Sequence, residues 1–133
     1  MSKILTDKAP APIGPYSQGI LTQGAGKTLY CSGAIPVDPV SGEIPAGIEA
    51  QTELALKNLL AVINEAGFDP TDVVKTTCFL TDMGDFAAFN GIYAKYLSGG
   101  AATGAPARSC VAVAALPKGV SVEIEAIAFR SGQ

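Results

Sequence analysis

The chain places charged side chains inside two segments that otherwise have the composition of buried β-strands. Residues 108–114 begin with Arg108 and continue with small and apolar residues, and residues 120–130 hold Glu123 and Glu125 among valine, isoleucine and alanine. Charges are rare in such strands unless they are paired or bind a ligand. A guanidinium suits a carboxylate, because its planar fork donates two parallel hydrogen bonds. The two segments therefore predict strands that carry a site for a small organic acid.

The strand period decides which of these side chains share a face. Alternate residues of a strand point the same way, so Arg108 and Cys110 are expected on one face and Ser109 on the other. Glu123 and Glu125 share a face about 6.6–7 Å apart, where mutual repulsion raises a pKa if both are buried. Two alternatives stay open. Arg108 either binds a ligand or forms an ion pair with Glu123, Glu125 or an interface carboxylate, and the glutamates either act in a site or lie on a solvated rim.

Hydrophobic periodicity predicts the other elements. In the first part of the chain we expect a short edge strand at 3–6, an extended proline-rich loop to 15, and strands at 17–23 and 28–32 around a turn at 24–27. A loop at 36–47 and a helix at 48–66 that ends at Gly67 should follow. After them we expect a strand at 73–81, a second helix with Asp85 as N-cap, and a loop at 98–105. In the first helix the leucines and Ile63 should face inward and Lys57, Asn58, Asn64 and Glu65 outward. The aromatic stripe of the second helix (Phe86, Phe89, Tyr93, Tyr96, Leu97) is expected in the core. This order predicts an α+β fold, a mainly antiparallel sheet with two helices on one face, formed by residues 1–133 as a single domain.

Composition limits the partners of the chain. Charged residues make up 16% of the sequence, against about 25% in ordinary globular domains, so we expect part of the surface to be covered in an oligomer. The net charge is −3 without a run of Lys or Arg, which argues against nucleic acid and anionic membrane partners. Neither a signal peptide nor an apolar run of about 18 residues is present. We therefore expect a soluble, cytoplasmic protein.

The content of cysteine and histidine limits the chemistry. Cys31, Cys78 and Cys110 lie far apart without a CxxC pair, so neither a disulfide framework nor a zinc site is expected. The chain has no histidine, which excludes a Ser-His-Asp triad, a Cys-His pair, histidine-bound metals and a histidine-based ribonuclease mechanism. The glycine-rich segments do not match a nucleotide-binding fingerprint. No cofactor or metal is expected.

Four segments, in this order, resemble one known family. They are Ile13-Gly14-Pro15-Tyr16-Ser17-Gln18-Gly19, Ser32-Gly33-Ala34-Ile35-Pro36, Pro106-Ala107-Arg108-Ser109-Cys110 and Val122-Glu123-Ile124-Glu125-Ala126-Ile127-Ala128. The chain is thereby similar to the reactive intermediate deaminase A (RidA, or YjgF-type) family. The resemblance implies a chorismate-mutase-like fold in a homotrimer, in which the sheets form a central barrel with three clefts between subunits. It also implies hydrolysis of reactive enamines and imines, such as 2-iminobutanoate and 2-iminopropanoate, to 2-oxo acids and ammonia.

The resemblance also assigns roles to residues. Arg108 would bind the substrate carboxylate, and Glu123 would orient or deprotonate the attacking water. The backbone at Ser109 and Cys110 would hold water and substrate, and Tyr16 would assist at the imine nitrogen. Ser32 and Asn90 would line the pocket. The loop at Thr103-Gly104-Ala105 lacks the bulky residue that often precedes the proline in this family, which predicts a wider pocket.

Each assignment has a structural alternative. Tyr16 could be a core aromatic residue, Ser32 a turn residue and Asn90 a solvated helix residue. Glu125 is expected in a structural or interface ion pair. Cys110 lacks a histidine to activate it and would behave as a small hydrophobic residue, although Arg108 on the same face would favour its thiolate and its oxidation.

Two further functions stay open. The same arginine pocket would serve a non-catalytic sensor of 2-oxo acids or other metabolites. Alternatively, the apolar surface would suit a chaperone-like protein.

Overall fold

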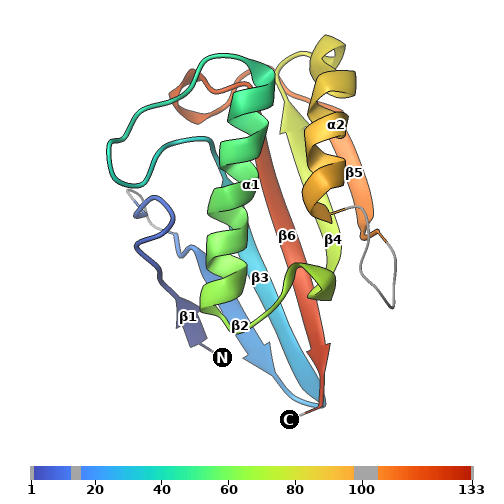
Figure 1. Ribbon diagram of the computed structural model, residues 1–133. Coiled ribbons are helices and arrows are strands. Elements are labelled where there is room, and N and C mark those ends of the chain that lie inside the picture. The colour runs from blue at the N-terminus through green and yellow to red at the C-terminus, as the bar shows by residue number, and fades with distance from the viewer. Residues whose placement is uncertain (1, 13–15, 98–104, 133) are drawn as a thin grey trace.

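The computed structural model describes residues 2–12, 16–97 and 105–132 of the chain. Within these residues, one twisted sheet carries two α-helices on the same face (Figure 1). The strands are β1 (Ser2–Ile4), β2 (Gly19–Gln23), β3 (Gly26–Ala34), β4 (Val73–Leu80), β5 (Ala107–Ala112) and β6 (Val122–Ser131). The helices are α1 (Ile48–Glu65) and α2 (Phe86–Leu97), with short 3₁₀ turns η1 (Pro70–Asp72), η2 (Met83–Asp85) and η3 (Pro117–Gly119). The predicted α+β class, with both helices on one face, is confirmed.

The order of the strands in the sheet is β1-β2-β3-β6-β4-β5. Neighbouring strands pair antiparallel except β4 and β5, which run parallel. Parallel neighbours need a long crossover connection, and α2 supplies it between β4 and β5. The last two strands of the chain are thereby separated, because β4 lies between β5 and β6.

The core lies between the helices and the sheet. On β6 the residues Val122, Ile124, Ala126 and Ala128 are buried, while the residues between them are half-buried or exposed. Leu56, Leu59, Ile63 and Phe89 of the helices are fully buried against this face. Burying such a side chain contributes about 1.5–3 kcal/mol, so the alternation on β6 fixes which face of the strand meets the helices.

The opposite face of the sheet is not covered by either helix. Tyr30, Val74, Val111 and Phe129 are 43–47% exposed there or at its margin. We call the side of the sheet that bears these four residues and the two glutamates of β6 the outer face. A row of large apolar side chains on an open sheet face is the arrangement that an interface with another chain would cover.

Helix α1 matches its predicted limits but differs at one position. Gly67 follows the helix with a φ of 83°. This left-handed backbone conformation is typical of a glycine that ends a helix, as predicted. Asn58 was expected to face outward and this was wrong, because it is 2% exposed. Its amide donates hydrogen bonds of 2.9 Å to the carbonyl oxygens of Ile35 and Val37. An asparagine on the inward face thus holds the loop that follows β3.

The start of α2 also differs from the prediction. Asp85 was expected as the N-cap, but it is the last residue of the 3₁₀ turn η2. Asp82 caps that turn instead, and its side chain accepts a hydrogen bond of 2.8 Å from the Gly84 N–H. The aromatic stripe behaves as predicted, since Phe89, Tyr93 and Leu97 are buried and Phe86 and Tyr96 pack beside them. Among the described helices, neither is long and apolar enough to cross a membrane.

Candidate functional site

Arg108 lies at the start of β5, on the face of the sheet that meets the helices. One terminal nitrogen, Nη1, donates a hydrogen bond of 2.7 Å to Oδ1 of Asn90 on α2. The guanidinium carbon lies 4.7 Å from the centre of the Tyr93 ring and 5.4 Å from that of Phe86. Cation–π contacts at such distances contribute about 0.5–2 kcal/mol. Helix α2 therefore fixes the position and orientation of the guanidinium.

The alternative in which Arg108 forms an ion pair with a glutamate of β6 is not found within the chain. The ion pairs among the described residues are Lys57–Glu53 and Arg130–Asp72. Asn90, expected either in a pocket or in solvent, is instead the neutral partner of the guanidinium. A planar guanidinium has five N–H donors. A neutral partner leaves its charge available for an anionic ligand.

The Tyr93 ring packs against the guanidinium of Arg108, a role that the sequence did not predict. Its hydroxyl shares a buried hydrogen bond of 2.7 Å with Thr76 of β4. Burial raises the pKa of the Tyr93 hydroxyl, against a smaller lowering by the Thr76 hydrogen bond. Thr76 is the register partner of Arg108 in the parallel pair β4–β5. The ring that supports the guanidinium is therefore tied to the strand beside it.

Cys110 follows Arg108 on the same face, as predicted, and is half-buried. Burial raises the pKa of its thiol, and the nearby Arg108 charge lowers it by a smaller amount. The expected effect of Arg108, which favours the thiolate, is therefore present, but desolvation outweighs it and the net pKa of the thiol is raised. Ser109 is exposed on the opposite side of the strand, so its side chain does not lie beside the guanidinium.

Glu123 lies on the outer face of the sheet, as the alternation on β6 predicted. Burial raises the pKa of its carboxyl, and the Glu125 charge raises it further. The carboxylate rests directly against Gly33 of β3, where an added Cβ would overlap with it. Glu125 is exposed and takes part in neither of the two ion pairs found between the described residues. Its visible influence is therefore the electrostatic one on Glu123.

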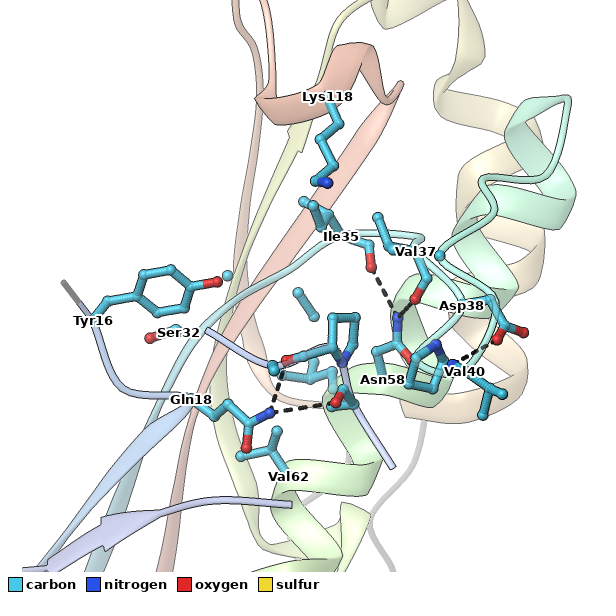
Figure 2. A pocket seen from close by; sticks show the side chains of 18 of the residues that line it. Tyr16, Gln18, Ser32, Ile35, Val37, Asp38, Val40, Asn58, Val62 and Lys118 are labelled. Carbon is cyan, nitrogen blue, oxygen red and sulfur yellow. Dashed lines mark hydrogen bonds between the residues drawn. The ribbon is translucent and has the colours of Figure 1, made fainter. Parts of the chain in front are cut away.

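Tyr16 and Ser32 line a pocket of about 310 Å³ on the β3 side of the molecule. Figure 2 shows the Tyr16 ring beside Ser32, and Lys118 extending toward the pocket from η3. Tyr16 is 51% exposed, so the alternative of a buried core aromatic was wrong. The Ser32 hydroxyl donates to the carbonyl oxygen of Ser17. Gly33, against which the Glu123 carboxylate rests, also lines this pocket.

Gln18 holds the segment from Thr6 to Pro10, and the sequence reasoning did not single it out for this. Its side-chain oxygen accepts a hydrogen bond of 2.7 Å from the Thr6 N–H, and its nitrogen donates to the carbonyl oxygens of Thr6 and Pro10. Figure 2 shows Gln18 among the residues that line the pocket. It is 5% exposed. Lys118 was also missed. It has a φ of 58°, a backbone conformation that costs energy in a residue with a side chain and often marks functional segments.

The predicted site residues thus form two groups. The arginine group is Arg108, Asn90 and Cys110 on the helix-facing side of the sheet, and the glutamate group is Glu123, Tyr16 and Ser32 with Gly33 beside them. In register, Arg108 pairs with Thr76 while Glu123 pairs with Phe79, whose side chain lies on the other face of β4. The sheet therefore separates Arg108 from Glu123 within one chain. Thr103 and Gly104 of the loop predicted to widen the pocket lie outside the described residues.

The chemistry of the two groups is that of carboxylate binding and acid–base catalysis. A search of residues 2–12, 16–97 and 105–132 found no set of three His, Cys, Asp or Glu side chains placed to bind a metal ion. The groups present are a guanidinium held by neutral partners, a carboxylate with a raised pKa and a phenol. These groups suit the binding of an organic anion and the activation of water.

Comparisons with known proteins cover nearly the whole chain. Residues 6–130 match the family described as "Endoribonuclease L-PSP". The chain is 50% identical over 131 residues to the 2-iminobutanoate/2-iminopropanoate deaminase of Escherichia coli strain K12, which covers 98% of this chain and 99% of that protein. It is 49% identical over 131 residues to a RutC family protein of Haemophilus influenzae, with 98% of each chain covered.

Solved structures of similar proteins share the fold. The crystal structure of E. coli TdcF with bound serine has a TM-score of 0.90 and 46% sequence identity, covering 98% of this chain and 100% of that one. The structure of the YjgF gene product from E. coli has a TM-score of 0.89 and 47% identity, covering 98% and 99%.

Proposed function

The chain belongs to the RidA/YjgF family, and from this membership we propose that it hydrolyses reactive 2-imino acids to 2-oxo acids and ammonia. The substrates are of the class of 2-iminobutanoate and 2-iminopropanoate, which the name of the E. coli relative specifies. The observation that carries the proposal is the position of Arg108, whose guanidinium is held by α2 and forms no ion pair with a carboxylate of the described residues.

Arg108 binds the carboxylate of the imino acid. The hydrogen bond to Asn90 and the rings of Tyr93 and Phe86 hold the guanidinium before the substrate arrives. A preorganised fork loses little conformational freedom when it forms two parallel hydrogen bonds to a carboxylate. Binding there fixes the neighbouring C=N carbon in one place. Positioning of this kind supplies most of the rate gain for an imine that already hydrolyses unaided.

Glu123 activates the water that attacks this carbon. Its carboxylate takes a proton from the water as the C–O bond forms and the C=N π electrons move to nitrogen. Glu123 passes this proton to the nitrogen, which gives a carbinolamine. The C–N bond then breaks, and the hydroxyl proton moves to the nitrogen, so that ammonia leaves and the hydroxyl becomes the carbonyl group of the 2-oxo acid. A raised pKa suits a general base because it strengthens the carboxylate as a proton acceptor. The Tyr16 hydroxyl donates a hydrogen bond at the nitrogen, and backbone groups at Ser109 and Cys110 hold water and substrate.

The catalytic cleft lies between two copies of the chain, and three copies form the homotrimer that is expected of the family. The arginine group of one copy and the glutamate group of the next complete each cleft, because the sheet separates Arg108 from Glu123 within one chain. The outer face, with its exposed Tyr30, Val111 and Phe129, provides apolar surface for the central barrel of such an assembly. No cofactor or metal ion takes part in the proposed reaction.

The decisive experiment generates 2-iminobutanoate and 2-iminopropanoate in situ and follows their decay, with semicarbazide as a competitor for the free imine. The wild-type protein accelerates hydrolysis, and Arg108→Ala loses the hydrogen bonds to the carboxylate, about 1.5–3 kcal/mol each. The loss in kcat/KM is therefore on the order of 100-fold or more. Arg130→Ala is the matched control, because Arg130 lies at the exposed end of β6 and pairs with Asp72. Unchanged turnover by Arg108→Ala would remove the assignment of that residue.

A metabolite sensor is the second candidate, and the similar TdcF structure with bound serine favours it, because serine carries a carboxylate. In that case ligands bind at Arg108 without turnover, and Glu123→Ala leaves the function intact. Absence of any acceleration by a folded oligomer would favour the sensor over the deaminase. The ribonuclease of the family description finds no support in the residues, because the chain has no histidine and a net charge of −3.

A further inference from the structure

Two of the three cysteines lie side by side in the sheet. Cys78 of β4 and Cys110 of β5 are register partners in the parallel pair. Both side chains belong to the helix-facing side of the sheet, where Cys78 is 0% exposed and Cys110 is half-buried against the core. The sequence placed these residues far apart, and their pairing is a result of the β4–α2–β5 crossover.

The spacing between the Cα atoms of neighbouring strands is compatible with a disulfide bond between register partners. Adjacent strands lie about 4.7–4.9 Å apart, within the range of about 4.4–6.8 Å between Cα atoms that a disulfide spans. Cys31 lies on β3, and β6 separates that strand from β4. Two strand spacings exceed the limit of about 7 Å between Cα atoms beyond which a disulfide requires backbone movement. Cys78 and Cys110 are therefore the pair of described cysteines that the fold brings within bonding range.

We propose that Cys78 and Cys110 form a reversible thiol–disulfide pair, in which a hydroperoxide oxidises Cys110 and Cys78 then closes the bond. The Cys110 thiolate attacks the peroxide, breaks the O–O bond and becomes a sulfenic acid, while the other oxygen leaves as hydroxide or alkoxide. The Cys78 sulfur then attacks the sulfenic sulfur. An S–S bond forms, the S–O bond breaks, and the thiol proton leaves with the hydroxyl group as water.

Exposure determines which thiol reacts first. Cys110 is partly accessible, while Cys78 lies beneath the helices and contacts no solvent. The Arg108 charge favours the Cys110 thiolate, although burial opposes it more strongly. Burial raises the pKa of the Cys78 thiol to about 12, which leaves it protonated and unreactive toward peroxide. Cys78 is therefore suited to resolving a sulfenic acid next to it but not to initiating the oxidation.

Closure of the disulfide would change the position of the arginine group. Arg108 precedes Cys110 by two residues on the same face and is held against α2. Drawing Cys110 toward Cys78 shifts this part of β5 relative to α2, so oxidation is expected to lower the rate of imine hydrolysis. This consequence rests on the proposed function, whereas the formation of the bond does not.

A peptide map tests the bond directly. The full-length protein is treated with hydrogen peroxide, its remaining thiols are alkylated and the product is digested with trypsin. Cleavage after lysine and arginine places the three cysteines on separate peptides, 28–57, 76–95 and 109–118. We expect the oxidised protein to run as a monomer on a non-reducing denaturing gel. In the digest of this band, we expect peptides 76–95 and 109–118 to be linked by a disulfide bond. Cys31 stays alkylated, and dithiothreitol reverses the link.

Three variants complete the test. Cys78→Val, which places an apolar residue of high β-propensity in the strand, leaves Cys110 as a sulfenic acid that dimedone traps. Cys110→Ala leaves Cys78 reduced, and Cys31→Ala retains the link as the matched control. The proposal is overturned if wild-type Cys110 carries only oxygen adducts, links to another chain or to Cys31, or stays unmodified while small-molecule thiols in the same solution are oxidised. A link without a change in imine hydrolysis retains the redox pair and removes only its coupling to Arg108.

Discussion

Arg108 on β5 and Glu123 on β6 lie on opposite faces of one sheet, with β4 between their strands. Arg108 faces the helices, where Asn90 and Tyr93 hold it. Glu123 faces the other way and rests against Gly33. A small imino acid cannot reach both side chains of one chain, so the proposed reaction requires two copies of the chain at each cleft.

Mixing two inactive variants tests this requirement. Arg108→Ala and Glu123→Gln are each expected to lose most of the imine hydrolysis as pure assemblies. After they are unfolded and refolded together, some clefts combine an intact arginine from one copy with an intact glutamate from the other. We expect activity to return in the mixture, measured by imine decay. A mixture that assembles but stays as inactive as its components would place both residues of the site in one chain.

Asn90→Ala is expected to weaken the arginine anchor without removing its charge. The variant loses the 2.7 Å hydrogen bond to Nη1 of Arg108, and hydrogen bonds to charged groups contribute about 1.5–3 kcal/mol. We expect kcat/KM to fall by roughly tenfold or more, mainly through KM, and by less than in Arg108→Ala. Asn64→Ala is the control, because Asn64 is exposed at the end of α1. Equal kinetics of the two variants would show that Asn90 does not position Arg108.

The pH dependence of the reaction is expected to report the pKa of Glu123. The ionised carboxylate is the active form, so activity is present above this pKa and is lost as the pH falls through it. Burial and then Glu125 raise this pKa above the ordinary value of 4.5. Glu125→Gln removes the second cause, and we expect the acidic limb of kcat/KM to move to lower pH while remaining above the ordinary value. A limb that does not move would show that Glu125 does not act on the titrating group.

Asn58→Ala is expected to destabilise the fold. The substitution removes two hydrogen bonds to the carbonyl oxygens of Ile35 and Val37 in a buried setting. Leaving a buried polar group without its partner costs about 1–3 kcal/mol, so the free energy of unfolding should fall by at least this amount in a urea titration. Asn64→Ala again serves as the control, with a change of about 0.5 kcal/mol or less. A similar change for both variants would contradict the structural role of Asn58.

Much of the local structure could be predicted, because it depends on periodic burial. The alternation on β6 correctly assigned Glu123 and Glu125 to one face, and the spacing around Leu56 and Ile63 correctly predicted a helix. The same reasoning failed at Asn58, since an asparagine on the inward face of a helix is indistinguishable from an outward one until its carbonyl partners are in place. It also did not foresee that Tyr93 supports Arg108, because one aromatic stripe serves both the core and the guanidinium.

The sequence by itself determined which residues point together along each strand and helix, because that depends on backbone periods of about 2 and 3.6 residues. It also determined the exclusion of histidine chemistry, because that depends on composition alone. Only the tertiary structure decided how separate elements lie beside one another. The parallel pairing of β4 and β5 placed Cys78 next to Cys110. The position of β4 between β5 and β6 in the sheet separated Arg108 from Glu123. Strand order arises from packing between segments that are distant in the sequence, and no local period encodes it.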